Sequence, residues 1–200
     1  MAGPIDFYFD FSSPYGFFAS TRIDDLAGHY GRIVKWRPIL LGAAFKISGQ
    51  KPLMEVPLKG EYSRHDFVRF GRLLDLKFRL PDPFPFGAVA ASRAFYWLDA
   101  RDPALAKRFA KAVFRQAYIA GVDVTGVDFV CDLAAGMGVP REDLKAALAS
   151  AEIKEVLRKE VEAAVAKGVF GSPYIVVDGE PFWGADRLAQ VEEWLVTGGW

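Results

Sequence analysis

A strand pattern that runs directly into a helix start constrains the fold of this chain most strongly. Residues 5–11 place an apolar side chain at every second position, which is the period of a strand with one buried face. Ser12-Ser13-Pro14 follows at once. A serine before a proline is the expected opening of a helix, because the hydroxyl caps free amides and proline fits the first helical position. The pattern predicts a helix over about residues 14–27.

The next segments extend this unit into an α/β pattern. Residues 33–41 predict a second strand that ends at Pro38. Residues 42–87 mix Gly, Pro and charged residues without sustained periodicity, which indicates a long connection with short helical pieces. Residues 88–167 are expected to be helical, with breaks near 102–103, 121–126 and 136–140.

The strand pattern returns near the C-terminus. Residues 174–178 predict a strand, Asp178-Gly179 a tight hairpin turn, and residues 185–196 a closing helix. This order of elements is that of an α/β, thioredoxin-like fold with a large all-helical insertion and a four-stranded sheet. We expect a thioredoxin-like domain of residues 1–44 and 167–200, and a helical insertion domain of residues 45–166.

Charge and hydropathy argue against several classes of function. Lys and Arg total 25, as do Asp and Glu, so no overall field favours nucleic acid or an anionic membrane surface. No uncharged apolar stretch approaches the roughly 18 residues of a membrane span. The start, Met1 to Asp6, lacks the basic region of a secretion signal. We expect a cytoplasmic protein that binds neither nucleic acid nor membrane.

The scarcity of cysteine and histidine limits the chemistry of the chain itself. Cys131 is the only cysteine, so neither an internal disulfide nor a dithiol redox pair can form. His29 and His65 lack metal-binding spacing, and we expect no metal site. Any thiol chemistry therefore requires a thiol from another molecule.

Three motifs in the expected order carry a resemblance to one family. Residues 10–15 (Asp-Phe-Ser-Ser-Pro-Tyr), 168–173 (Gly-Val-Phe-Gly-Ser-Pro) and 182–188 (Phe-Trp-Gly-Ala-Asp-Arg-Leu) resemble motifs of 2-hydroxychromene-2-carboxylate isomerases. These are bacterial relatives of kappa-class glutathione transferases with a DsbA-like thioredoxin fold. The resemblance spans the chain and includes residues 46–52, where Gln50 replaces the Asn that family members commonly carry.

The resemblance implies that glutathione is the cofactor and Ser13 the catalytic residue. Residues 13–16 stand where dithiol oxidoreductases of this fold carry Cys-x-x-Cys, at the amino end of a helix. Free amides and a partial positive charge stabilise an anion there. Ser13 would donate a hydrogen bond to the glutathione thiolate, because no His and acid partners are evident that would make it a nucleophile. The alternative is that Ser13 only caps the helix.

Further contacts to glutathione follow from the same resemblance. Pro173 stands at the position of a cis-proline, and Ser172 would pair its backbone with the cysteinyl part, so that its side chain matters little. The amides of Ala185 and Asp186 would hold the γ-glutamyl carboxylate, and the Asp186 carboxylate its ammonium group. A trans Ser-Pro loop and an ordinary first-turn acid are the alternatives. The implied glutathione site comprises Ser13, Ser172, Pro173, Trp183, Gly184, Ala185 and Asp186.

Tyr15, Lys46 and Gln50 are the candidate substrate-binding residues. Lys46, Gln50 and Lys51 lie in the long connection expected to overhang the first helix, where a cation would bind a carboxylate. An exposed loop lysine is the alternative. Tyr15 lies beside the motif serine and is expected to line the site.

The resemblance implies an enzyme, a glutathione-dependent cis-trans isomerase. It would interconvert 2-hydroxychromene-2-carboxylate and trans-o-hydroxybenzylidenepyruvate in aromatic catabolism, through reversible addition of the glutathione thiolate. The substrate would be a small aromatic carboxylate and the protein a homodimer. A kappa-class-like glutathione transferase or peroxidase shares the predicted site. A non-catalytic thioredoxin-fold binding module is the third hypothesis.

Overall fold

The strand predicted from residues 5–11 lies inside a four-stranded sheet. In the computed structural model, which describes residues 3–200, the strand order is β2-β1-β3-β4. β1 pairs in parallel with β2, and β3 pairs antiparallel with both β1 and β4. The predicted sheet and hairpin are thus confirmed, with strands β1 (Ile5–Phe9), β2 (Val34–Pro38), β3 (Tyr174–Val177) and β4 (Glu180–Trp183). The predicted domain segment of residues 1–44 and the prediction about a secretion signal both begin at Met1. Met1 and Ala2 lie outside the described residues.

The helix predicted over residues 14–27 is instead two helices, α1 (Pro14–Ser20) and α2 (Ile23–His29). The chain turns between them at Thr21, whose Oγ1 donates a hydrogen bond to the carbonyl of Phe18 at 2.7 Å. A side-chain hydroxyl of this kind competes with backbone amides for helix acceptors, which favours a break. The prediction of one continuous helix was wrong for this reason.

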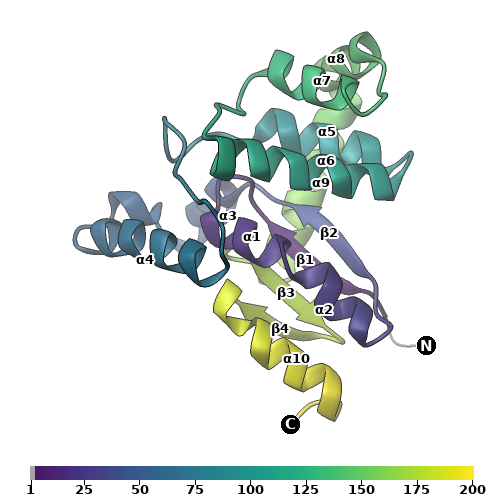
Figure 1. Ribbon diagram of the computed structural model, residues 1–200. Helices are drawn as coiled ribbons and strands as arrows, with labels where there is room; N and C mark the ends of the chain where they lie inside the picture. The colour runs from purple at the N-terminus through teal and green to yellow at the C-terminus, as the bar shows by residue number, and fades with distance from the viewer. Residues whose placement is uncertain (1–2) are drawn as a thin grey trace.

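The segment of residues 42–87 is more helical than predicted. α3 (Leu41–Ser48) and the 3-10 helix η1 (Leu53–Glu55) are short, but α4 (Lys59–Leu73) has 15 residues. Its fully buried residues are one large apolar residue and three small ones, and Phe70 is half-buried against Phe18, so the helical period is weak in the sequence. Those buried residues are Gly60, Ser63, Phe67 and Gly71. Figure 1 shows α4 extending to one side of the sheet.

The helical segment has its predicted breaks. The chain leaves the helix after Asp99, after Ala120 and after Ala135, as predicted, but a further break at Ser150, between Ala149 and Ala151, was not predicted. The elements are α5 (Val89–Asp99), α6 (Pro103–Arg115), the π-helix η2 (Gln116–Ala120), α7 (Val127–Ala135), α8 (Arg141–Ala149) and α9 (Ala151–Ala166). In Figure 1 these helices lie together above the sheet.

One hydrophobic cluster joins the sheet to these helices. The ring of Phe9 packs against Phe95 of α5 and Phe114 of α6, with centroid distances of 6.1 and 5.4 Å. The sheet and the helical segment therefore share a core. The division into a domain of residues 1–44 and 167–200 and a domain of residues 45–166 stays a prediction.

The chain ends in the predicted hairpin and helix. The 3-10 helix η3 (Ala185–Arg187) follows β4 directly, and α10 (Leu188–Thr197) begins three residues later than predicted. The amino end of this last helical unit is therefore a tight 3-10 turn. It contacts α1, which brings the end of the chain to the start of the first helix.

Candidate active site

Ser13 caps α1 and also contacts the loop before β3. Its Oγ accepts a hydrogen bond from the amide of Gly16 at 3.0 Å and donates one to the carbonyl of Ser172 at 2.9 Å. Ser13 is therefore a helix cap, as the alternative interpretation holds, but it also bridges two segments far apart in sequence. Its proton now points to a neutral carbonyl, and rotation of the hydroxyl would present that proton to an anion at the start of α1.

The Ser172-Pro173 peptide bond is cis, as predicted, and the alternative of a trans loop is wrong. The predicted proximity of this loop to Ser13 is confirmed by the hydrogen bond at Ser172. A Cβ at Gly16 would lie 2.7 Å from Ser172 Oγ, so glycine is needed where α1 meets the loop. The carbonyl of Pro173 accepts a hydrogen bond from the amide of Gly184 at 3.1 Å, which ties the loop to the end of β4.

The side chain of Ser172 does more than predicted. Its Oγ accepts a hydrogen bond from the amide of Asp10 at 2.9 Å, in a buried contact between segments 162 residues apart. The expectation that this side chain matters little was wrong, because its partner is a backbone amide at the end of β1. The Ser172 amide has no hydrogen-bond acceptor within residues 3–200, and its carbonyl retains a second lone pair. This backbone can therefore pair with an extended ligand segment, as an added strand would.

Asp10 is a buried carboxylate that sequence reasoning placed only within a motif. Its Oδ1 accepts hydrogen bonds from the amide and hydroxyl of Ser12 at 2.8 and 2.9 Å, and its Oδ2 accepts one from the amide of Leu41 at 2.8 Å. Burial raises the pKa of Asp10, and these hydrogen bonds act in the opposite direction. The signal available in the sequence was an acidic residue at the end of a buried strand, directly before the motif serines.

The segment between β4 and α10 lies beside the Ser172-Pro173 loop, to which the amide of Gly184 is hydrogen-bonded. Gly184 has φ +120°, and a Cβ there would lie 2.3 Å from Asp186 Oδ1, so only glycine fits. Ala185 is buried, whereas the Asp186 side chain is 65% exposed and lies 4.0 Å from Arg187. The amides of Ala185 and Asp186 have no acceptor within the described chain. Two donors and a carboxylate thus lie together at this turn.

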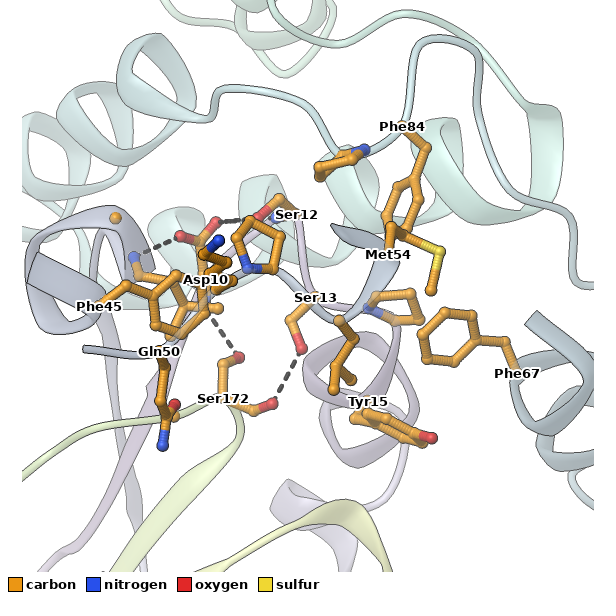
Figure 2. A pocket seen from close by; sticks show the side chains of 18 of the residues that line it. Asp10, Ser12, Ser13, Tyr15, Phe45, Gln50, Met54, Phe67, Phe84 and Ser172 are labelled. Carbon is orange, nitrogen blue, oxygen red and sulfur yellow. Dashed lines mark hydrogen bonds between the residues drawn. The ribbon is translucent and has the colours of Figure 1, made fainter. Parts of the chain in front are cut away.

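A cavity of about 1250 Å³ joins these segments, with walls of two kinds (Figure 2). One wall, which we call the polar wall, carries serine hydroxyls, backbone amides and a carboxylate. It consists of Ser12, Ser13, Tyr15, Gly171, Ser172, Trp183, Gly184, Ala185 and Asp186. The other, which we call the apolar wall, consists of Met54, Phe67, Phe70, Phe84 and Phe86, whereas Phe45 of α3 lies beside Gln50 (Figure 2).

Tyr15 lines the cavity with its ring, but its hydroxyl is engaged. The hydroxyl donates a hydrogen bond to Asp66 Oδ2 at 2.5 Å, and the ring packs edge-on against Phe67 at a centroid distance of 5.0 Å. Burial and the Asp66 carboxylate raise the pKa of Tyr15 well above its ordinary value. Tyr15 therefore links α1 to α4 and remains a neutral phenol at neutral pH.

Of the predicted residues on the long connection, Gln50 lines the cavity and Lys46 does not. Lys46 lies on α3 with an exposed side chain. The cavity is lined instead by Lys51, which the sequence analysis names together with Lys46, and by Lys59, which it does not single out. Neither forms an ion pair within residues 3–200, so both ammonium groups are available to an anionic ligand.

The polar wall fits the functional groups of glutathione. Its cysteinyl backbone needs a donor and an acceptor, which Ser172 offers, and its γ-glutamyl end needs amides and a carboxylate, which Ala185 and Asp186 offer. A thiolate needs a donor at a helix amino terminus, which Ser13 provides. The Tyr15 amide, in the first turn of α1, also has no acceptor among the residues described.

The remaining features to consider are possible metal ligands, membrane-spanning helices and the cysteine. Within residues 3–200, no three His, Cys, Asp or Glu side chains gather closely enough to hold a metal ion. No helix in that range combines the length and apolar character needed to cross a membrane. Cys131 is buried in α7, and burial raises the pKa of its thiol.

Three features together define a thioredoxin-fold protein without redox cysteines. They are a serine at the amino end of α1, a cis-proline beside it and a sheet with a helical insertion. The chain belongs to the family of DsbA-like thioredoxin domains, whose model matches residues 4–196.

Individual relatives agree with this family. The chain is 30% identical over 198 residues to the 2-hydroxychromene-2-carboxylate isomerase of Sphingobium xenophagum, covering 98% of this chain and 100% of that protein. It is 24% identical over 204 residues to glutathione S-transferase kappa 2 of Caenorhabditis elegans, covering 96% and 91%. The solved structure of a selenomethionine 2-hydroxychromene-2-carboxylate isomerase superposes with a TM-score of 0.86 at 25% identity, covering 94% and 92%.

Proposed function

We propose that this protein is a glutathione-dependent isomerase of 2-hydroxychromene-2-carboxylate and trans-o-hydroxybenzylidenepyruvate. The observation that carries the proposal is that polar groups suited to glutathione and a set of aromatic side chains line the same cavity. The relatives named as isomerases of this substrate support the reaction, because they match this chain over nearly its whole length. The kappa-class relatives support the cofactor.

The polar wall is proposed to hold glutathione at three places. Ser172 would pair with the cysteinyl backbone, Ala185 and Asp186 would hold the γ-glutamyl end, and Ser13 would face the thiol. Gly184 allows the turn that brings the Asp186 carboxylate close to the chain. Trp183 packs over Gly171, since a Cβ there would lie 2.2 Å from the indole Nε1, and it would form one side of the groove.

Bound glutathione supplies a thiolate that adds reversibly to a conjugated double bond, which allows rotation about that bond before elimination. The protein's part is to keep this thiol ionised and in place. Ser13 would do so by turning its proton from the Ser172 carbonyl to the sulfur, and the amino end of α1 adds its partial positive charge. The half-buried phenol of Tyr15, hydrogen-bonded to Asp66, would keep the first turn of α1 in position.

The apolar wall is proposed to hold the aromatic ring of the substrate. Its side chains come from η1, α4 and the loop of residues 84–86, and the cavity that they line is large enough for a bicyclic ring beside glutathione. Gln50, Lys51 and Lys59 would meet the carboxylate at the edge of this wall. Lys46 stays a prediction, but Lys51 and Lys59 are better placed because they line the cavity.

The decisive assay follows isomerisation of 2-hydroxychromene-2-carboxylate by absorbance with and without glutathione. We expect turnover only with glutathione. Equal rates in both conditions would exclude the cofactor role, and no turnover in either would favour the transferase. A parallel screen of electrophiles and hydroperoxides separates these activities, because the kappa-class relatives make transferase chemistry the second candidate.

Calorimetric titration with glutathione tests the site itself. Asp186→Ala should weaken binding strongly, because the ammonium group of glutathione would lose its carboxylate partner. Asp143→Ala removes an exposed carboxylate from the first turn of α8, far along the chain, and serves as the matched control. Equal affinities for both variants would exclude the assignment of Asp186. Absence of binding to the unaltered protein would favour a non-catalytic binding module.

The cytoplasm, where reduced glutathione is abundant, and a role in aromatic catabolism follow from the same proposal. We propose a homodimer as well, which sedimentation equilibrium tests. Exposed apolar side chains on and around α3 and α4 support it, among them Ile47, Leu58 and Leu73 at 73%, 89% and 75% exposure.

A further inference from the structure

α3 begins without a cap of its own. Leu40 precedes it in an extended conformation and makes no side-chain capping hydrogen bond. The first helical amide, that of Leu41, donates instead to Oδ2 of Asp10 at 2.8 Å. Asp10 lies 31 residues earlier, at the end of β1. A carboxylate from another segment thus does the work of a helix cap, and its charge also complements the positive end of α3.

The same carboxylate fixes the start of α1. Its Oδ1 accepts hydrogen bonds from both the amide and the hydroxyl of Ser12, and the Asp10 carbonyl accepts one from the amide of Ser13 at 2.9 Å. Figure 2 shows Asp10 between Phe45 of α3 on one side and Ser12 on the other, with dashed lines to both segments. One side chain therefore connects the starts of two helices that both line the cavity.

α3 has few other contacts that would hold it in place. Ala44 is its only buried residue, and Leu41, Ala43 and Phe45 are half-buried. The helix leads directly to Gln50 and Lys51, which line the cavity. The position of these two side chains relative to Ser13 therefore depends on the hydrogen bond between Asp10 and Leu41 more than on packing.

The burial of the Asp10 carboxylate also has an energetic cost. It is 5% exposed and forms no ion pair within residues 3–200, and burial of a carboxylate without a cation is unfavourable. Its three acceptor contacts offset that cost only while all of its donors are in place. If the side chain at this position served packing alone, an apolar residue could replace the carboxylate without loss of stability.

We propose that Asp10 is a positioning residue that holds the α3 side of the cavity in register with Ser13. A substrate carboxylate held at Gln50 or Lys51 then meets the thiol site at a fixed separation. The kinetic part of this inference rests on the proposed isomerase function. The structural part does not, because it concerns α3 and the glutathione site alone.

The test uses a pair of variants at Leu41. Proline is tolerated at the first helical position, and the extended Leu40 suits the residue before a proline, so Leu41→Pro removes the amide donor with little cost to the helix. Leu41→Ala truncates the same side chain but keeps the donor. The difference between the two variants isolates the hydrogen bond to Asp10.

The measurement is amide hydrogen exchange. The amides of residues 42–51 should exchange roughly tenfold faster or more in Leu41→Pro than in Leu41→Ala, which is the scale of a lost hydrogen bond to a charged group. The KM of Leu41→Pro for the hydroxychromene carboxylate should rise by a similar factor, with glutathione affinity within about twofold. Asp10→Asn should change both the KM and the glutathione affinity. An asparagine side chain has only one oxygen, so its NH2 group would face the amide donor of either Ser12 or Leu41, and one of the two hydrogen bonds would be lost.

Asp102→Asn is the matched control, because Asp102 caps α6 through its own side chain, away from the cavity. It should leave glutathione affinity, KM and exchange at residues 42–51 unchanged. Identical exchange and KM in Leu41→Pro and Leu41→Ala would overturn the proposal, as would Asp10→Asn behaving like the control. If exchange and glutathione titration respond as expected but no variant isomerises the substrate, the proposed function fails and the positioning role stands.

Discussion

The two walls of the cavity are built in opposite ways. The polar wall is held by hydrogen bonds between short side chains and backbone, such as Ser13 to Ser172 and Asp10 to Ser172, across 159 and 162 residues. The apolar wall is held by ring packing, such as Phe67 against Phe84 at a centroid distance of 6.2 Å. The polar wall therefore has one precise geometry, whereas the apolar wall can adapt to different rings. Reaction chemistry is expected to depend on the first wall and substrate choice on the second.

The largest effect is expected from Ser13→Ala, which removes the donor to the thiolate from the polar wall. Loss of one such donor costs about 100-fold or more in rate at neutral pH. The pKa of the bound thiol should rise, so part of the rate should return at higher pH as the thiolate forms unaided. The measurement is the pH dependence of kcat/KM for isomerisation.

The control for this variant is Ser150→Ala. Ser150 caps α9 by accepting a hydrogen bond from the amide of Ile153, as Ser13 caps α1, but it lies outside the cavity. Both variants should lose about 1 kcal/mol of stability from the missing cap. Only Ser13→Ala should lose activity. Equal activity losses would mean that Ser13 is a structural cap and nothing more.

A smaller effect is expected from Gly184→Ala, at the other end of the polar wall. The added Cβ would lie 2.3 Å from Asp186 Oδ1 on a backbone with φ +120°. Backbone strain of this kind costs about 1 to 3 kcal/mol, and displacement of the carboxylate should weaken glutathione binding roughly tenfold. Calorimetry measures the affinity directly.

Gly138→Ala separates the effect of backbone strain from the effect of the steric clash with Asp186. Gly138 also has a positive φ, +90°, but a Cβ there has nothing within 4 Å and the residue does not line the cavity. It should lower the free energy of unfolding while leaving glutathione affinity unchanged. A similar affinity loss in both glycine variants would mean that general destabilisation, rather than the position of Asp186, sets the binding.

The contrast between the walls also explains how far the sequence predicted the structure. Most of the polar wall follows from short motifs, since a cap before a proline and a serine before another proline are local features. What the motifs could not reveal was the partner of each hydroxyl. The Ser172 side chain was misjudged because it bonds to the amide of Asp10, which is distant in sequence.

The apolar wall could not be assembled in the same way. Its side chains come from η1, α4 and the loop of residues 84–86, and whether they lie together depends on how these segments pack. The length of α4 was underestimated because only one large apolar side chain of this helix, Phe67, is fully buried, and Phe70 beside it is half-buried. The sheet, by contrast, was predictable, since the alternation in residues 5–11 is local and β1 is buried as that pattern requires.

On the apolar wall, Phe84→Leu should raise the KM for the aromatic substrate by about two- to tenfold, the scale of a lost aromatic pair contact. Glutathione affinity should stay unchanged, because Phe84 belongs to the other wall. Phe129→Leu, a half-buried ring on α7 outside the cavity, is the control for loss of an aromatic side chain. A parallel change in glutathione affinity in Phe84→Leu would show that the walls do not act separately.

The smallest effect is expected where the two walls meet solvent, at the lysines. Lys51 lines the cavity and Lys46 does not, although both side chains are exposed and only five residues apart. An exposed ion pair contributes about 0.2 to 1 kcal/mol, so Lys51→Gln should raise KM by roughly two- to fivefold. Because such a pair is screened by salt, the difference from the unaltered protein should shrink as ionic strength rises. Lys46→Gln should change KM less, since its ammonium group lies outside the lining residues. KM measured for both variants at low and high salt decides between them. A larger, salt-sensitive effect in Lys46→Gln would return the substrate carboxylate to Lys46 and would mean that α3 moves toward the cavity when substrate binds.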